Sequence, residues 1–358
     1  MNQPLHTIYG GAHLFKSTTC SKLGALAQRA FAEYAPDAAA IEKVFAIPEN
    51  LAETVHARVA GKLQREPLED FRIDFEDGFG VRSDDEEDAA ADNAAREVAA
   101  AVQAGSLPGM FGIRVKSFSS DATKARALRT LDRFLGQATL PENFVVTLPK
   151  ITAPSQVTEL VDALRPYPEV RIEIMIETPR SIFMLRQLLD AADGKCIAAH
   201  FGAYDYTASL GITAANQVLH HPACQFARSM MLASLAETGV WLVDGATNIL
   251  PFPPAVHSAW KLHYDNIRHS LYNGFYQGWD LHPAQIPARL VAVHTFFLEG
   301  LAEASIRLRN FMDQAQQATR MGAIFDDAAT GRGLLNYFER AVRCGAIAES
   351  DVPVKRSS

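Results

Sequence analysis

The stretch FVVTLPKITAPSQVTELVDALRPYPEVRIEIMIE, residues 144–177, contains the pattern that decides the fold. Its two ends, residues 144–150 and 171–177, are short and rich in β-branched and apolar residues, which is typical of buried strands. The longer segment between them has the apolar spacing of a helix. A strand, a helix and a second strand in this order predict two parallel strands joined by a crossover helix.

The same alternation extends along most of the chain. Each short β-rich run is followed by a longer stretch rich in Ala and Leu, and strands are predicted at residues 8–15, 71–77, 111–116, 144–150, 171–177, 197–205, 240–244 and 278–282. Eight such parallel units close into a (β/α)8 barrel, the TIM barrel. We therefore predict an α/β fold in which residues 1–300 form a TIM-barrel catalytic domain.

The pattern changes after the last predicted strand. Long helical stretches are predicted at residues 288–320 and 334–343, and the segment between them, residues 322–333, is rich in turn residues. We assign residues 301–358 to a C-terminal helical arm. Its apolar face needs a surface to cover, which is either its own barrel or a neighbouring subunit. That face consists of Leu334, Leu335, Phe338 and Val342.

Composition and charge narrow the class of function. The 358 residues include 34 Lys and Arg against 41 Asp and Glu, a net charge of −7, without the basic cluster that a nucleic-acid binder needs. No apolar run approaches the roughly 18 residues of a membrane span, and the first residues lack the pattern of a signal peptide. The four cysteines lie far apart and predict neither a disulfide framework nor a zinc ribbon. We expect a cytoplasmic protein that acts on a small molecule.

Ionisable side chains lie at or near the ends of seven consecutive predicted strands, from the second to the eighth. The C-terminal strand ends of a barrel meet at one mouth, where the active sites of this fold lie. Each residue alone is equally well explained by an ion pair at the barrel rim, but the whole set favours an active site. These residues are Asp74, Glu76, Asp77, Arg114, Lys116, Lys150, Glu177, Asp205, Asp244, Asp280 and His282.

Glu177 and Asp205 predict a metal site. They end adjacent strands, about 4.8 Å apart in the sheet, so their carboxylates can reach one cation. Mg²⁺ prefers oxygen ligands and usually takes one or two carboxylates, which leaves positions for water and for a substrate with adjacent carboxylate and carbonyl oxygens. The ion would stabilise an enolate formed at that carbonyl, and the planar fork of Arg114 suits a substrate carboxylate. This pattern predicts carbon–carbon bond chemistry next to a carbonyl group.

Several segments in register resemble the signature segments of the HpcH/HpaI aldolase and citrate lyase β-subunit family. They are Asp74-Phe75-Glu76-Asp77, Leu148-Pro149-Lys150, Ile176-Glu177-Thr178, Phe201-Gly202-Ala203-Tyr204-Asp205 and His282-Pro283-Ala284-Gln285. The resemblance implies a barrel that forms a homo-oligomer through C-terminal helices and binds Mg²⁺ or Mn²⁺. It also implies cleavage or formation of a carbon–carbon bond in a 2-oxo acid, a 3-hydroxy acid or an acyl-CoA. Glu177 and Asp205 match the metal ligands of the family.

The other matching positions give a predicted catalytic set. Arg114 matches the substrate-binding arginine of the family, Glu76 and Asp77 match the acidic pair above the metal, and Lys150 belongs to one of the shared segments. The alternative for Arg114 is an ion pair with Glu76 or Asp77 at the rim. The class II aldolase branch has a catalytic histidine at the position of Asp77, so the chain is closer to the citrate lyase and malyl-CoA lyase branch. The general base stays unassigned.

The last strand departs from the acyl-CoA branch. That branch usually has a Gly-Lys pair where this chain has Gly278 and Trp279, and an indole cannot replace a cation. A CoA thioester is therefore an open alternative for the substrate rather than the expected one.

These residues support three hypotheses for the function. The leading hypothesis is a divalent-metal-dependent lyase or aldolase that acts through a metal-stabilised enolate. The second is a Claisen-type condensing enzyme or an acyl-CoA thioester hydrolase on the same barrel. The third is a barrel that binds a small oxo acid without converting it, which the many carboxylates at strand ends disfavour.

Two other patterns are interpreted as structural. The acidic run at residues 84–88 follows Ser83, and Ser83 and Glu86 have the spacing of a capping box, so we predict a helix start rather than a metal cluster. His220 and His221 precede a proline and lack the spacing of a His-Glu-x-x-His zinc motif, which predicts a loop or a helix start.

Overall fold

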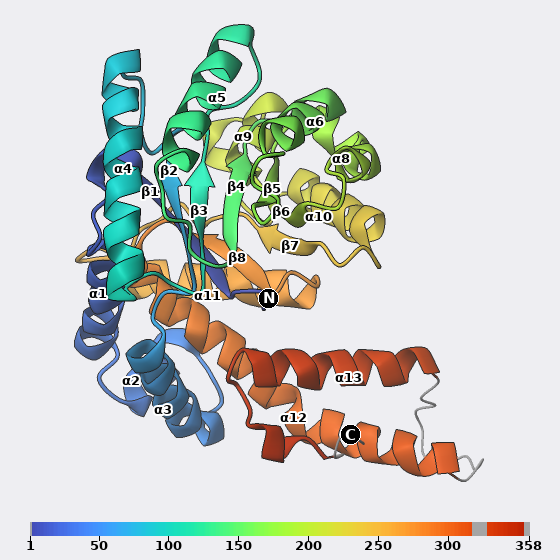
Figure 1. Cartoon of the computed structure of the whole chain (residues 1–358). Helices are drawn as coiled ribbons and strands as arrows, with labels where there is room; N and C mark the ends of the chain where they lie inside the picture. Colours follow the sequence, from blue (N-terminus) through green and yellow to red (C-terminus); the bar gives the residue numbers. More distant parts are fainter. Residues whose placement is uncertain (1, 317–327, 354–358) are drawn as a thin grey trace.

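Eight parallel strands close into a barrel in the computed structural model, which describes residues 2–316 and 328–353 (Figure 1). Each strand pairs with the next along the chain, and the last pairs with the first. The predicted TIM barrel is confirmed. The strands are β1 (His6–Gly11), β2 (Asp70–Asp74), β3 (Met110–Arg114), β4 (Phe144–Leu148), β5 (Arg171–Ile176), β6 (Cys196–Phe201), β7 (Trp241–Asp244) and β8 (Gln277–Asp280).

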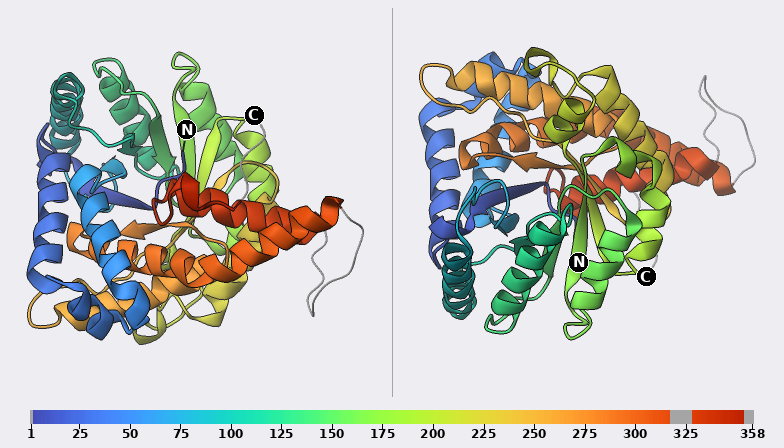
Figure 2. Two further views of the ribbon diagram at one scale, coloured as in Figure 1. Left: turned by 90° about the horizontal axis from the view of Figure 1, so that it is seen from below. Right: turned by 90° about the horizontal axis from the view of Figure 1, so that it is seen from above.

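Helices surround the barrel and form its outer layer (Figure 2). The α-helices of the described residues are α1 (Thr19–Tyr34), α2 (Ala38–Phe45), α3 (Glu49–Arg65), α4 (Asp84–Ala104), α5 (Asp121–Leu135), α6 (Pro154–Ala163), α7 (Pro179–Phe183), α8 (Leu185–Ala191), α9 (Ala203–Ser209), α10 (Pro222–Leu235), α11 (Val256–Tyr272), α12 (Ile286–Gln316) and α13 (Ala328–Arg343), of which α13 and the end of α12 project beyond the barrel. None of the helices in the described ranges combines the length and the apolar character that a membrane crossing needs.

Several predicted strands extend too far at their C-terminal ends. Residues 12–14, predicted as part of the first strand, form a short 3-10 helix, and Asp205 lies in the first turn of α9. The second strand stops at Asp74 because the Asp74 carboxylate accepts the backbone N–H groups of Glu76 (3.0 Å) and Gly78 (2.7 Å), which turns the chain. Sheet pairing of β2 therefore ends where a side chain at the barrel rim binds the backbone.

The barrel interior is polar rather than filled with the branched apolar residues that are common in this fold. Buried Arg72 donates to Asp70 and, through Nη2, to Glu173 Oε2 at 3.1 Å. Glu173 also accepts from Thr147 Oγ1 (2.9 Å) and from the Tyr9 hydroxyl (3.2 Å). Burying these charges is tolerated because each is paired and hydrogen-bonded. The apolar residues of the strands point outward against the helices.

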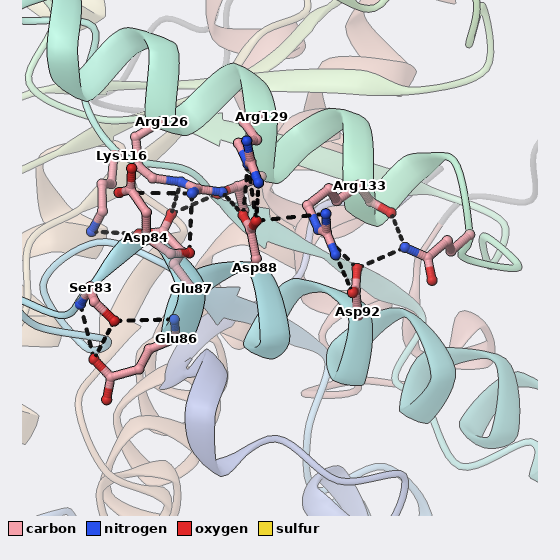
Figure 3. Close-up of polar contacts among 12 residues, drawn as sticks. Ser83, Asp84, Glu86, Glu87, Asp88, Asp92, Lys116, Arg126, Arg129 and Arg133 are labelled. Carbon is pink, nitrogen blue, oxygen red and sulfur yellow. Dashed lines mark hydrogen bonds and ion pairs between the residues drawn. The ribbon is translucent and has the colours of Figure 1, made fainter.

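A row of ion pairs joins α4 to α5 (Figure 3). Asp88 accepts from Arg126 Nη2 at 2.5 Å and from Arg129 Nε at 3.0 Å, and Asp92 accepts from Arg133 Nε at 3.1 Å. The acidic run of residues 84–88 thus opens α4, as predicted, and also supplies Asp88 to the interface with α5, which was not predicted from the sequence.

Both predicted helix starts are confirmed. The Ser83 hydroxyl accepts the N–H of Glu86, and the Glu86 carboxylate accepts the N–H of Ser83 at 2.9 Å, which completes the capping box. His221 is the N-cap of α10 and accepts the N–H of Ala223 at 3.1 Å.

The C-terminal helices extend from the end of the barrel that is opposite the mouth (Figure 1). α12 runs beyond the barrel and α13 returns along it, with Leu334 and Phe338 buried. Residues 328–333, predicted as part of a turn-rich segment, are helical because α13 begins at Ala328. The remainder of that segment, residues 322–327, and the predicted end of the first helix, residues 317–320, lie outside the described residues.

Candidate active site at the barrel mouth

Arg114 is held at the end of β3 by Asp74, which ends the neighbouring strand. Its Nε donates to Asp74 Oδ1 at 2.7 Å and its Nη2 to Oδ2 at 2.6 Å, and Arg114 is only 1% exposed. Burial lowers the pKa of Arg114, but the Asp74 carboxylate outweighs burial and raises the net pKa above its usual value. Glu76 and Asp77 lie farther away, at 3.5 and 3.7 Å from Nη1. The main partner of Arg114 is therefore Asp74, which sequence reasoning missed.

Two aromatic rings pack against the Arg114 guanidinium. Its central carbon lies 4.9 Å from the ring centre of Tyr9 and 5.5 Å from that of Trp279, and the two rings are 4.6 Å apart. Such contacts favour a cation at this position. Trp279, which occupies the position of the lysine in the acyl-CoA branch, is thus part of the wall that positions Arg114.

Lys150 and the acidic pair form a second cluster beside Arg114. The Lys150 Nζ donates to Glu76 Oε1 at 2.6 Å and to Asp77 Oδ1 at 2.9 Å. Burial lowers the pKa of Lys150, but hydrogen bonds to both carboxylates outweigh it and raise the net pKa. Burial raises the pKa of Glu76, whereas for Asp77 the Lys150 hydrogen bond and the charge of Arg114 outweigh burial and lower the pKa. The two neighbouring carboxyl groups therefore differ in how readily they hold a proton.

Glu177 follows β5 and is buried beneath this cluster. Its Oε1 accepts the backbone N–H of Lys150 at 2.5 Å. Gly202, on the adjacent strand end, leaves room for the carboxylate, because a Cβ there would lie 2.4 Å from Glu177 Oε2. Burial, and next the charge of Asp205, raise the pKa of Glu177 to about 8. The Asp205 carboxylate thus lies close enough to disfavour the negative charge of Glu177.

This pair fits a hard cation that needs few protein ligands. Among the residues that the structure describes, no group of three or more His, Cys, Asp or Glu side chains is placed to hold a metal ion. Two carboxylates with open positions for water and substrate are nevertheless the usual protein contribution to a Mg²⁺ site. A cation between Glu177 and Asp205 would also remove the repulsion that raises the pKa of Glu177.

Four residues of the predicted set lie elsewhere or act otherwise, and one of them, Lys116, pairs with Glu87 of α4 at 3.3 Å. Asp244 accepts from Arg228 of α10 at 2.9 Å, and Asp280 accepts from Arg289 of α12 at 2.7 Å, so both are buried between the barrel and its helices. Successive residues of a strand face opposite sides of the sheet, and these two face outward. His282 caps the turn that follows β8, because its Nδ1 accepts the N–H of Ala284. The prediction that they contribute to the mouth is wrong for Asp244 and Asp280.

The fold is shared with solved structures of low sequence identity. A crystal structure of a citrate lyase from Burkholderia xenovorans LB400 is 18% identical, with a TM-score of 0.66 over 98% of this chain and 96% of that one. The CitE protein from Mycobacterium tuberculosis, in complex with magnesium, acetoacetate and coenzyme A, is 19% identical, with a TM-score of 0.56 over 94% of this chain and 97% of that one. The fold that the sequence resemblance implies is confirmed.

Comparison with the curated proteins found no match. The family described as a domain of unknown function, DUF6986, has a model that matches residues 1–357. The chain therefore belongs to the DUF6986 family.

Proposed function

We propose that this protein is a divalent-metal-dependent carbon–carbon lyase that acts on a small 2-oxo acid, a 3-hydroxy acid or an acyl-CoA. The observation that carries the proposal is the placement of Glu177, buried beside Asp205, at the same mouth as the anchored Arg114. The resemblance of the fold to a citrate lyase, and to CitE in complex with magnesium, acetoacetate and coenzyme A, supports this reaction class. We expect the homo-oligomer and the cytoplasmic location that the sequence predicts.

Glu177 and Asp205 would hold Mg²⁺ or Mn²⁺ in this proposal. Bound there, the ion supplies Lewis-acid stabilisation of negative charge on a substrate carbonyl oxygen. The Lys150 backbone N–H orients the Glu177 carboxylate, and Gly202 keeps the space beside it free. The chain thus fixes one ligand of the site from two neighbouring strands.

Arg114 would bind the carboxylate of the substrate. Asp74 uses two of its five N–H donors and fixes the plane of the guanidinium, and the Tyr9 and Trp279 rings restrict its motion. Nη1 remains directed toward Glu76 and Asp77 at the mouth. A guanidinium fixed before the substrate arrives requires little reorganisation during the reaction.

Above the metal, Glu76 would transfer protons and Lys150 would supply a positive charge. The raised pKa of Lys150 keeps it positively charged, so it serves as a hydrogen-bond donor and not as a base. Glu76 has a raised pKa and is the better proton carrier of the acidic pair, because a general acid or base works best when its pKa approaches the working pH. Asp77 would keep Lys150 in place.

A substrate panel with and without Mg²⁺ tests the proposal. Purified full-length protein is incubated with 2-oxo acids, 3-hydroxy acids and acyl-CoA thioesters, and the products are identified by mass spectrometry. Glu177→Gln and Asp205→Asn should lose both turnover and divalent-ion binding in calorimetry. Glu53→Gln, at an exposed position of α3, is the matched control and should retain both.

The products separate the proposal from its alternatives. Turnover that does not depend on added or retained divalent ions would contradict the proposal of a metal-dependent lyase. Release of CoA from an acyl-CoA without carbon–carbon cleavage would identify a thioester hydrolase instead. Binding without any product would identify an oxo-acid-binding barrel.

A further inference from the structure

A cavity of about 400 Å³ lies at the N-terminal end of the barrel, opposite the mouth. It is lined by the end of α10, by the start of β7, by the residues just before β8, by α12 and by the end of α13. Figure 2 (left) shows the C-terminal part of α13 crossing this end of the barrel. The lining includes Leu232, Leu235, Trp241, Tyr276, Phe297 and Arg340. Apolar and aromatic side chains thus form one part of the wall, and the side chains of Gln3, Glu69, Glu237, Arg340 and Arg343 form the other. The volume is in the size range of small-ligand sites.

Arg340 is a half-buried cation without an acidic partner. Its guanidinium lies over the Tyr276 ring, 3.7 Å from the centre, and Nη1 donates to the neutral Gln3 side chain at 3.3 Å. Within the described ranges it forms no ion pair, because the adjacent Glu339 pairs with Arg343 at 2.5 Å. Burial lowers the pKa of Arg340, whereas ion pairs raise the pKa values of the buried arginines inside the barrel.

The acidic side chains that line the cavity do not pair with Arg340. Glu69 accepts the backbone N–H of Leu5 at 2.7 Å and pairs with Lys62 at 2.8 Å. Glu237 is exposed at the rim and forms no ion pair in the part of the chain that the structure describes. The uncompensated charge inside the cavity wall is therefore the positive charge of Arg340.

The position of Arg340 in its helix does not explain this arrangement. A basic residue in the last turn complements the helix dipole from an exposed position. Arg343 lies in the same turn and also lines the cavity, but it is exposed and its charge is paired with Glu339. Arg340 instead covers an aromatic face at the wall of the cavity, which places a planar, poorly hydrated cation beside an apolar space.

We propose that this cavity binds a small carboxylate with an apolar body, whose carboxylate pairs with Arg340 while its body lies against Leu235 and Phe297. A guanidinium recognises a carboxylate through two parallel hydrogen bonds, and the apolar part of the wall, which includes Leu235 and Phe297, favours a carboxylate with an apolar body over a compact, strongly hydrated anion. The ligand would contact both β7 and α13, so its binding stabilises the attachment of the arm to the barrel. The site is separate from the mouth and does not depend on the proposed lyase reaction.

Calorimetric titration of the full-length protein with octanoate tests the proposal. We expect saturable binding of one octanoate per chain, weak or no binding of inorganic phosphate, and no binding of octan-1-ol. Loss of a charge-assisted pair should weaken octanoate binding about 10- to 100-fold in Arg340→Gln. Leu232→Trp fills the cavity from its rim and changes no charge, so it should abolish binding even if Arg340→Gln fails to fold.

Arg332→Gln is the matched control, because it removes an exposed arginine from the same helix. It should bind octanoate as the unmodified protein does. The proposal is overturned if octanoate does not bind, or if Arg340→Gln and Leu232→Trp both bind it with unchanged affinity. It is also overturned if light scattering shows that Arg340→Gln separates a dimer and octanoate has no effect, because this surface is then an interface between two copies.

Discussion

Arg114 and Arg72 show how similar side chains in one barrel have different uses. Both are buried and paired with carboxylates of β2, but Arg72 is enclosed by Asp70 and Glu173. Arg114 has one nitrogen that faces the mouth, 3.5 Å from Glu76. The structure also revises the alternative that we considered for Arg114, because its principal ion pair is with Asp74 below the rim.

Arg114→Lys should lower both turnover and stability. Lysine keeps the charge but cannot donate two parallel hydrogen bonds to Asp74, so its ammonium would be poorly positioned. Loss of a positioned donor at an active site lowers kcat/KM by about 100-fold or more. The free energy of unfolding should fall by about 1–3 kcal/mol, because part of a buried pair is lost. Steady-state kinetics and urea unfolding measure the two effects, and unchanged kcat/KM with lowered stability would show a purely structural role.

The α4–α5 contact depends on Asp88, which pairs with Arg126, Arg129 and Arg133 (Figure 3). Hydrogen bonds from Arg129 and Arg126, although opposed by burial, lower the pKa of Asp88, so the stability that these ion pairs contribute is lost progressively as the pH falls below the ordinary pKa of an Asp carboxyl. Asp88→Asn should lower the free energy of unfolding by about 1–3 kcal/mol, since two guanidinium groups lose their carboxylate. Asp85→Asn, exposed in the same helix turn, is the control. Equal urea midpoints for the two variants would contradict this role.

The contact between α12 and the end of α13 should depend on pH. His294 is buried, its Nε2 lies 3.3 Å from the Cys344 carbonyl oxygen, and its Nδ1 has no hydrogen-bond partner among the described residues. Burial lowers the pKa of His294 from 6.5 to about 4. The unfolded chain therefore binds a proton between these pH values and the folded chain does not, so stability falls as the pH decreases through this window.

The effect of His294 on stability is measured by comparing the unmodified protein with the His294→Gln variant. The titration should cost the unmodified protein about 3 kcal/mol of unfolding free energy between pH 6.5 and pH 4. The variant lacks this titration, so its unfolding free energy should decrease less over the same range. Parallel pH profiles for the two proteins would show that His294 does not titrate in this way.

The arm extends from the barrel end that is opposite the mouth, so it does not cover the mouth of its own chain (Figure 1). Leu334 and Phe338 are buried within the chain, whereas Leu335 is 54% exposed on the same helix. Part of the predicted apolar face thus covers the chain's own surface. Packing of the remainder on a neighbouring subunit stays a prediction, as does the division at residue 300, which falls inside α12.

Leu335→Arg should lower the mass of the protein in solution if the arm contacts a neighbour. A buried arginine at an apolar interface lacks a partner and is costly. Light scattering at micromolar concentration compares this variant with Asn336→Arg, which adds the same charge at an exposed polar position of α13. An unmodified protein that is strictly monomeric would refute the expected homo-oligomer.

The barrel, the helix starts and the pairing of Glu177 with Asp205 could be predicted from the amino-acid sequence. These features depend on local patterns: the alternation of strands and helices, the spacing of Ser83 and Glu86, and the rule that parallel strands end at one edge. The sequence resemblance added the expected roles of the residues at that edge. Such local patterns can be recognised in the sequence without knowledge of the fold.

Other features depend on which distant residues meet when the barrel closes. Asp244 and Asp280 face outward, toward arginine partners on helices. Successive residues of a strand face opposite sides, so an error of one residue in the predicted position of the strand reverses the side that each residue faces. The pair of Arg114 with Asp74, the Trp279 wall and the cavity beside Arg340 each join segments far apart in the chain. Such contacts are set by the stagger and closure of the barrel, so only the tertiary structure decides them.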